Sequence, residues 1–204
     1  MLSVRRVVPT LAVVVVAAAC ATTGTGTMTP APGRARMVIP ITTQSPVALD
    51  EFLRGVHDLD VERPVTAREH FDRALAADPN FALGHLYAAF AAPSLATYRK
   101  HLEEAVRLAD RASPAEQLWI RAERLALDND LNNQGAFAQQ LVQLTPNDPR
   151  AFAYLAGVQF NAGNRADARA SLDRATQLDP NFAPGWILIG NSYLQTEPRD
   201  LAKA

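Results

Sequence analysis

The chain has 204 residues, of which 48% are hydrophobic and 20% are charged, and its formal net charge is -1. This composition can supply a substantial core, and it excludes a disordered acidic tail and the basic surface of a nucleic-acid-binding protein. The only cysteine leaves no partner for an intramolecular disulfide and too few ligands for a cysteine-rich zinc site.

The first nineteen residues have the three parts of an export signal. Arg5 and Arg6 precede an apolar run from Val7 to Val16, and three alanines then precede Cys20. The apolar run is shorter than the ~20 residues that a permanent membrane-spanning helix needs. We therefore expect residues 1–19 to be a signal peptide.

The cysteine that follows these alanines resembles the lipid-bearing cysteine of a bacterial lipoprotein signal. The resemblance implies that Cys20 carries acyl chains, which hold a protein at a membrane surface without spanning it. Ala17 stands where that signal favours leucine, and an unmodified cysteine behind a conventional cleavage site is the alternative. Because Ala21 stands in place of an aspartate, the resemblance implies a location in the bacterial cell envelope, lipid-anchored at the periplasmic face of the outer membrane.

Residues 20–45 combine this cysteine with a stretch rich in Thr, Pro and Gly. Such a stretch buries too little apolar surface to offset the entropy lost on ordering it. We therefore predict a flexible tether. Met37–Ile41 is an apolar patch within it, and either packs along the first helix or serves as a partner-binding strand.

Residues 46–204 contain a repeated phrase. Residues 78–82 and 179–183 both read Asp-Pro-Asn-Phe-Ala, 101 residues apart, and Pro146 lies in a third turn 34 residues before Pro180. This period resembles that of the tetratricopeptide repeat (TPR), a helix-turn-helix unit that stacks into a solenoid.

The residues within one period support this resemblance. In the unit 149–182 the places that the family fills with bulky, small and turn residues hold Phe152, Leu155, Ala156, Ala168, Leu172, Ala175 and Pro180. The resemblance implies an all-α fold, a right-handed superhelical solenoid of TPR units at 48–81, 82–114, 115–148 and 149–182, with an incomplete unit at 183–204.

Helix-start signals divide the chain independently of this resemblance. Ser113-Pro114 with Glu116 forms a capping box, Ser45-Pro46 opens the first helix, and Thr66 with Glu69 predicts another box. Asn164 with Asp167 opens a further helix, and Pro93 interrupts a helix that restarts near Leu95. No segment alternates apolar and polar residues over the length of a strand, which favours an all-α chain.

The sequence offers no arrangement of catalytic or metal-binding residues. The histidines are scattered, at His57, His70, His85 and His101, and Glu69-His70 with Asp72 is interpreted as solvated surface. Phosphate-binding loops, nucleophile elbows and zinc-binding helix motifs are missing. We therefore expect a chain that is not an enzyme, with no catalytic residue, metal or cofactor.

The TPR resemblance implies a concave groove lined by fixed positions of each unit's first helix. These positions hold Phe52, Val56, Leu86, Phe90, Trp119, Glu123, Phe160, Ile187 and Asn191. The lining is largely apolar and lacks the Lys and Asn that clamp a carboxylate in some members, which favours an apolar helix or extended peptide as ligand. The alternative for apolar positions of these helices is packing against their neighbours; for Phe90 and Trp119 together we favour the groove.

The expected function is a non-catalytic protein-interaction scaffold or assembly factor, whose partner is another envelope protein or a peptide segment. One alternative is an envelope protein that binds a small ligand or a glycan. A second is the regulatory subunit of an enzyme on another chain.

Overall fold

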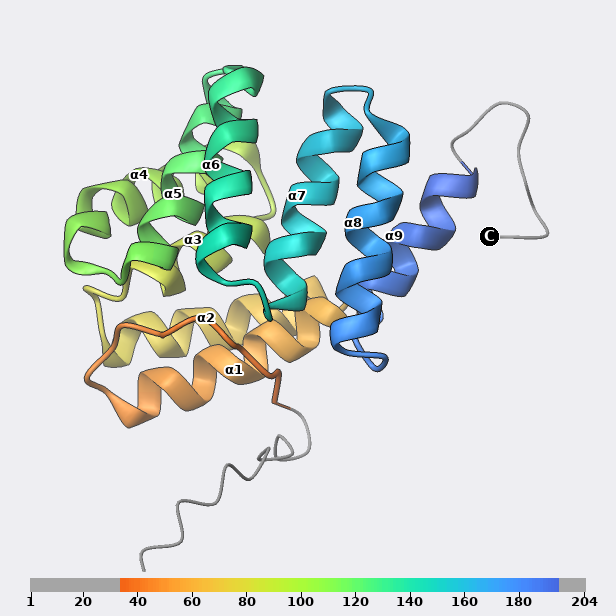
Figure 1. Cartoon of the computed structure of the whole chain (residues 1–204). Helices are drawn as coiled ribbons and strands as arrows, with labels where there is room; N and C mark the ends of the chain where they lie inside the picture. The colour runs from red at the N-terminus through yellow and green to blue at the C-terminus, as the bar shows by residue number, and fades with distance from the viewer. Residues whose placement is uncertain (1–33, 195–204) are drawn as a thin grey trace, which may run out of the picture.

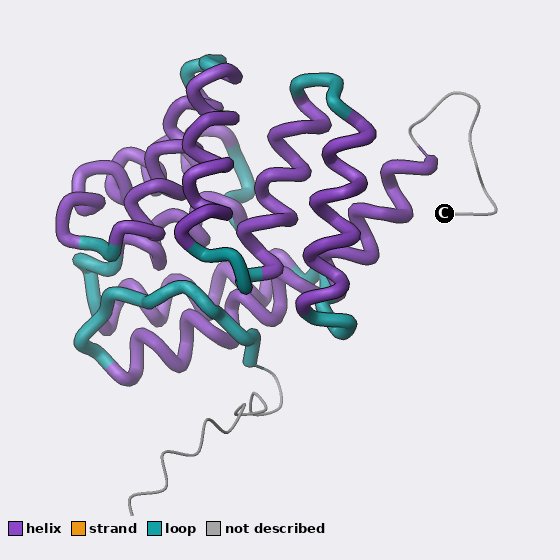
Figure 2. The backbone as a smooth tube through the Cα atoms, in the orientation of Figure 1, coloured by secondary structure: helices purple, strands orange, loops and turns teal. Residues whose placement is uncertain are grey.

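The computed structural model describes residues 34–194, and in that range the chain forms helices and no strand (Figures 1 and 2). This confirms the predicted all-α class. Consecutive helices pack as hairpins, which stack along the chain. The hairpins are α1 (Pro46–Asp60) with α2 (Pro64–Ala77), α3 (Ala82–Phe90) with α4 (Leu95–Leu108), α5 (Pro114–Leu127) with α6 (Leu131–Leu144), and α7 (Pro149–Asn161) with α8 (Arg165–Leu178); the short turn η1 (Ala109–Arg111) follows α4, and α9 (Ala183–Leu194) follows the last hairpin.

The hairpins follow the units expected at 48–81, 82–114, 115–148 and 149–182, except that α1 begins two residues and α5 one residue before the expected bound; α9 lies within the range 183–204. The predicted signal peptide, Cys20, the tether as far as residue 33 and the end of the last unit lie outside the described residues. None of the helices in the described range is both long and apolar enough to cross a membrane.

Serine caps and prolines begin several helices where the sequence predicted them. The hydroxyl of Ser45 accepts the N–H of Ala48 at the start of α1, and Ser113 with Glu116 completes the capping box of α5. The box predicted at Thr66 is wrong, because α2 begins two residues earlier, at Pro64. Proline has no N–H to lose and a φ already suited to a helix, so it starts this helix without a side-chain cap.

The larger core cluster extends from α1 to the start of α7. Its centre is aromatic: the ring of Phe52 lies 4.9 Å from that of Phe81 and 5.1 Å from that of Tyr87, both edge to face. Full burial of such a side chain contributes about 1.5–3 kcal/mol. A second cluster joins α7, α8 and the residues around Phe182.

Residues 34–45, which we call the strap, lie extended along α1 and run antiparallel to it (Figure 2). Odd-numbered residues from 35 to 45 are buried or partly buried, and even-numbered residues from 36 to 44 are exposed. This is the two-residue period of an extended chain. The flexible tether predicted through residue 45 therefore does not hold for residues 34–45, and Met37–Ile41 packs along the first helix, as one of its two interpretations expected.

The array curls enough to bring its first and fourth units into contact. The guanidinium of Arg150 at the start of α7 makes a two-pronged contact with the carboxylate of Asp60 at the end of α1, with Nη1 2.7 Å from Oδ1. Both side chains are largely buried. The strap passes beside this contact, since Nε of Arg150 donates to the carbonyl of Arg36 at 3.3 Å.

Candidate functional site

The first helices of the third and fourth units hold the strap with carboxylates at their N-terminal ends. Asp148 is the N-cap of α7, and its Oδ1 accepts the N–H of Arg150 at 2.8 Å. Its other oxygen, Oδ2, accepts the N–H of Ile39 at 3.1 Å. Asp148 is fully buried, and burial raises the pKa of this carboxyl.

Glu116 divides its oxygens at the start of α5 in a similar way. Oε2 accepts the N–H of Ser113 at 2.7 Å and completes the capping box, while Oε1 accepts the N–H of Thr42 at 3.0 Å. The hydroxyl of Thr42 also donates to Glu116 and accepts the N–H of Ser113 at 3.0 Å. At Asp148 one oxygen serves the helix end and the other the strap, whereas at Glu116 Oε1 serves the strap and Oε2 serves both the helix end and the hydroxyl of Thr42.

Further main-chain contacts fix the strap along its length. The hydroxyl of Ser113 donates to the carbonyl of Pro40 at 3.1 Å, and the N–H of Ala35 donates to the carbonyl of Leu53 at 3.0 Å. These contacts do not depend on the identity of the strap's side chains. The array therefore recognises an extended main chain at this place.

Side chains on the inner side of the strap enter the larger core cluster. Ala35 and Ile39 belong to it, Ile39 with 3% of its surface exposed, and Met37 packs against it. The sulfur of Met37 lies 4.0 Å from the hydroxyl of Tyr87. The strap is thus an extended segment whose inner side chains pack against the core of the array while its outer side chains face solvent.

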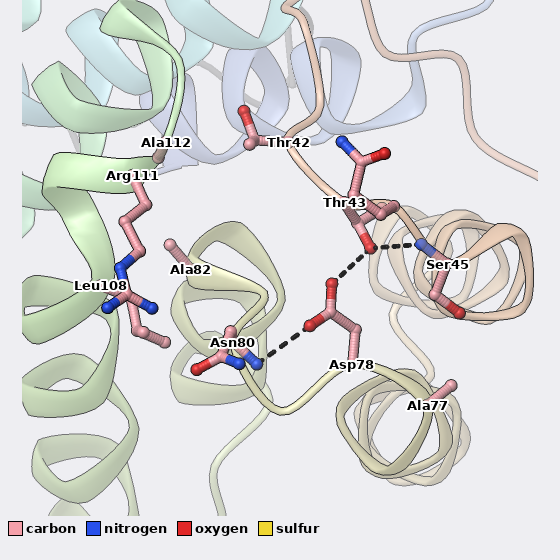
Figure 3. A pocket seen from close by; sticks show the side chains of 11 residues that line it. Thr42, Thr43, Ser45, Ala77, Asp78, Asn80, Ala82, Leu108, Arg111 and Ala112 are labelled. Carbon is pink, nitrogen blue, oxygen red and sulfur yellow. Dashed lines mark hydrogen bonds between the residues drawn. The ribbon is translucent and has the colours of Figure 1, made fainter.

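A pocket of about 470 Å³ opens where the strap ends, between the strap, the turn after α2 and the end of α4 (Figure 3). Asp78 stands at its edge: Oδ2 accepts the hydroxyl of Thr43 at 2.6 Å, and Oδ1 accepts the N–H of Asn80 at 3.0 Å. Asp78 belongs to the repeated Asp-Pro-Asn-Phe-Ala phrase. The turn residue of the phrase thus also anchors the strap.

Four of the predicted groove residues are core residues. Phe52, Val56 and Leu86 have no exposed surface, and Trp119 is 4% exposed. They share one cluster with Ala35 and Ile39 of the strap. The predicted accessible lining is corrected at these four positions, because the repeat register indicates which side of a helix faces inward but not what covers that side.

Glu123 takes part in a polar network that joins three helices. Its Oε1 accepts the hydroxyl of Tyr98 on α4 at 2.6 Å, and its Oε2 accepts the hydroxyl of Tyr154 on α7 at 3.1 Å. Burial and the nearby carboxylate raise the pKa of both tyrosines. Glu123 therefore connects neighbouring units in this structure.

The other predicted groove residues keep some accessible surface. Phe90 is 36% exposed at the end of α3, Phe160 and Ile187 are partly buried, and Asn191 is exposed. They lie on α3, α7 and α9, and Phe160 packs against the second cluster while Phe90 contacts Tyr87. The structure therefore does not gather the nine predicted residues into a single open groove.

Two of the histidines that are scattered in the sequence meet in the structure. Nδ1 of His85 lies 3.3 Å from Nδ1 of His101, and Nε2 of His85 lies 3.2 Å from the carbonyl of Pro79. Because a carbonyl only accepts, Nε2 of neutral His85 carries the proton, and its Nδ1 accepts from His101. Burial lowers the pKa of both imidazoles.

His70 is not the solvated residue that the sequence suggested. Its side chain is 16% exposed, with Nδ1 2.7 Å from Glu51 and Nε2 3.6 Å from Asp58. In the described part of the chain, no three side chains of the metal-binding types His, Cys, Asp and Glu come together to hold a metal ion.

The chain is similar in backbone course to several solved structures. They include a thermophilic TPR protein, TTC0263, from Thermus thermophilus (18% identity, 72% of this chain and 81% of that chain, TM-score 0.49). They also include YrrB, a TPR protein with an unusual peptide-binding site (19% identity, 76% of this chain and 80% of that chain, TM-score 0.43). A further one is MamA 41-end from Desulfovibrio magneticus RS-1 (13% identity, 77% of this chain and 89% of that chain, TM-score 0.42). No protein-family model and no curated protein matches the chain.

Proposed function

We propose that this chain is a TPR-type protein that acts as a non-catalytic interaction scaffold, anchored by a lipid on Cys20 in the bacterial cell envelope. The observation that supports binding is the strap itself: the array holds an extended segment through main-chain contacts and two buried apolar side chains. The basic start, the short apolar run and the alanines before Cys20 support the anchor.

The glycan alternative depends on exposed aromatic rings in the groove. Phe52 and Trp119 are buried, which leaves Phe90 and the partly buried Phe160 as the rings of the predicted groove that keep accessible surface. Rings on two separate helices, α3 and α7, one of them partly buried, offer little stacking surface for a chain of sugars. A protein or peptide partner is therefore the better supported ligand.

Site-specific photo-crosslinking in cells that naturally make the chain tests the scaffold proposal. A photoreactive residue at Phe90, on a first helix, is expected to capture one dominant envelope protein. The matched control is Val65, which is also exposed but lies on a second helix. Equal capture at both positions, or no protein above background at Phe90, would contradict the proposal.

Lipidation is tested separately, by feeding the same cells a labelled fatty acid. The wild-type chain should incorporate the label and fractionate with membranes, and Cys20→Ser should do neither. Label retained on Cys20→Ser would refute the anchor without bearing on the scaffold.

A further inference from the structure

We propose that the strap is an exchangeable ligand, and that the groove it occupies binds in trans an extended peptide of the strap's own pattern. That pattern is the segment Ile39–Thr43: a large apolar residue, proline, a second apolar residue and two threonines. The inference rests on the proposed scaffold function, and it names the site and the chemical class of the partner.

Main-chain recognition sets the register of the bound peptide. The two buried carboxylates accept N–H groups three residues apart, those of Ile39 and Thr42. Between them, the carbonyl of Pro40 accepts the hydroxyl of Ser113. An extended peptide can satisfy all three contacts at once, whereas the N–H and carbonyl groups within a helix are already paired with each other.

Side chains select the sequence within that register. Ile39 enters the core cluster, so this place favours a large apolar residue. Thr42 and Thr43 each place a hydroxyl against a carboxylate, that of Glu116 and that of Asp78 respectively. Pro40 fits between Ile39 and Thr42. Proline has no N–H, and the register described above requires no N–H at this position; proline also favours an extended backbone in the residue before it.

Helices α5 and α7 retain their caps when the strap leaves, which makes exchange structurally possible. Asp148 caps α7 through Oδ1, and Glu116 closes the capping box of α5 through Oε2. The contact of Asp148 Oδ1 does not involve the strap, and the bond between Ser113 and Oε2 of Glu116 can persist after both groups lose their second partner, the hydroxyl of Thr42. Apart from Ser45, which caps α1, the strap contributes no residue to a helix, and its even-numbered residues from 36 to 44 are exposed to solvent.

Covalent attachment explains why the groove is filled in the isolated chain. The strap continues directly into α1 at Ser45, and a ligand joined by a short connection has an effective concentration on the order of millimolar. A free peptide of equal intrinsic affinity therefore binds weakly until the strap is loosened, since its apparent affinity falls with the fraction of open groove.

The test uses the full chain with a weakened strap and a synthetic peptide of residues 34–45, RARMVIPITTQS, labelled with a fluorophore. Ile39→Pro with Thr42→Pro removes the two main-chain donors and alters no helix. Fluorescence anisotropy should show saturable binding of the peptide to this variant, about tenfold or more tighter than to the wild-type chain. A peptide that carries the same two prolines should not bind.

A second pair of changes tests the groove side. Asp148→Asn and Glu116→Gln each keep one oxygen for the helix cap and replace the other by an NH₂ group, which cannot accept the peptide's N–H. Added to the strap variant, they should weaken peptide binding at least tenfold. Asp130→Asn, at the N-cap of α6, is the matched control and should leave binding unchanged.

A folded strap variant that does not bind the peptide would overturn the inference, and so would equal binding to variant and wild-type chains. If the strap variant does not fold, hydrogen exchange of the wild-type chain decides. The inference expects the amides of Ile39 and Thr42 to exchange by local opening, well before those of Ala74 and Leu141 in the core helices. Exchange of all four only through global unfolding would make the strap a permanent part of the core.

These results are independent of the crosslinking at Phe90. Failed peptide binding together with a dominant crosslinked protein would reject the exchangeable strap and keep the scaffold. Peptide binding without any crosslinked protein would keep the exchangeable strap and reject the scaffold.

Discussion

Trp119 shows at the scale of one residue how packing overrides an interpretation drawn from repeat position. Its ring lies 5.9 Å from that of Tyr87 and 5.5 Å from that of Tyr154, so it joins three first helices. Its indole N–H is buried and has no hydrogen-bond partner. Such an arrangement is typical of a side chain that stabilises the fold by filling space in the core.

Trp119→Ala should therefore lower the free energy of unfolding by about 3–5 kcal/mol, because it leaves a large cavity. Phe90→Ala, at the half-covered ring nearby, should cost about 1 kcal/mol or less. Urea denaturation followed by circular dichroism measures both. Similar losses for the two variants would mean that Trp119 is not the core residue described above.

Asp50 gives a prediction about pH at the same scale. A hydrogen bond from Arg34 at the start of the strap lowers the pKa of this carboxyl, and Arg54 lowers it further. Because the folded-state pKa lies below the unfolded value, the contact contributes fully above the unfolded value, and its contribution is lost as the pH falls through the folded-state pKa.

Arg34→Ala should move the pKa of Asp50 back toward the ordinary carboxyl value, by more than Arg54→Ala does. Carboxyl carbon NMR titration of the two variants and the wild-type chain reports this order. An unchanged titration of Asp50 in Arg34→Ala would show that the strap does not begin at this contact in solution.

At the scale of elements, the close approach of α1 and α2 depends on one glycine. A Cβ built on Gly55 would lie 2.5 Å from Cε1 of the Phe71 ring, and this ring is itself fully buried. Gly157 on α7 has nothing within 4 Å of the same position. The two helical glycines thus differ only in what faces them.

Gly55→Ala should destabilise the chain by about 1–3 kcal/mol through overpacking, whereas Gly157→Ala should stabilise it by about 0.5–1 kcal/mol through helix propensity. Thermal denaturation should move the two midpoints in opposite directions. A rise in both midpoints would show that the α1–α2 crossing tolerates a methyl group.

Helix positions could be predicted from the sequence because local chemistry determines them. Ser113, Pro114 and Glu116 form their capping box within four consecutive residues, and the restart near Leu95 follows from Pro93. The strap could not be predicted in the same way. Val38 and Pro40 are apolar yet face outward, so the two-residue period of burial is hidden in the polarity pattern.

The candidate site depends on contacts between residues that are distant in sequence. Ile39 meets Asp148, 109 residues away, and Thr42 meets Glu116, 74 residues away. Glu116 was identified from the sequence as a capping residue, which is correct for one of its oxygens. Nothing in the local pattern could indicate the partner of the second oxygen.

At the scale of the whole molecule, Arg150 and Asp60 close the curl between the first and fourth units. The side chain of Arg150 is 8% exposed, and its guanidinium also lies 5.2 Å from the centre of the Phe182 ring. The repeat register places both residues at helix ends but does not determine how tightly the array curls. The closure was therefore beyond prediction from the sequence.

Asp60→Ala should cost about 3–5 kcal/mol of stability, because it leaves the buried guanidinium without its carboxylate. Asp60→Leu combined with Arg150→Met should cost less than the sum of the two single changes. The control is Arg124→Ala, which breaks an exposed pair with Asp128 and should cost well under 1 kcal/mol. Additive losses in chemical denaturation would show that Arg150 and Asp60 do not act as a pair.

Whether the strap is bound or released also determines the maximum distance between the array and a surface to which Cys20 is attached. With the strap bound, Ala35 is fixed beside the middle of α1 through Leu53; with the strap released, the first fixed residue would be Ser45 at the start of α1. The twelve residues from 34 to 45 would then no longer be held against α1, and they supply up to about 40 Å of contour length. For a chain fixed to lipid at Cys20, exchange of the strap would therefore couple the capture of a ligand to the height of the array above the membrane.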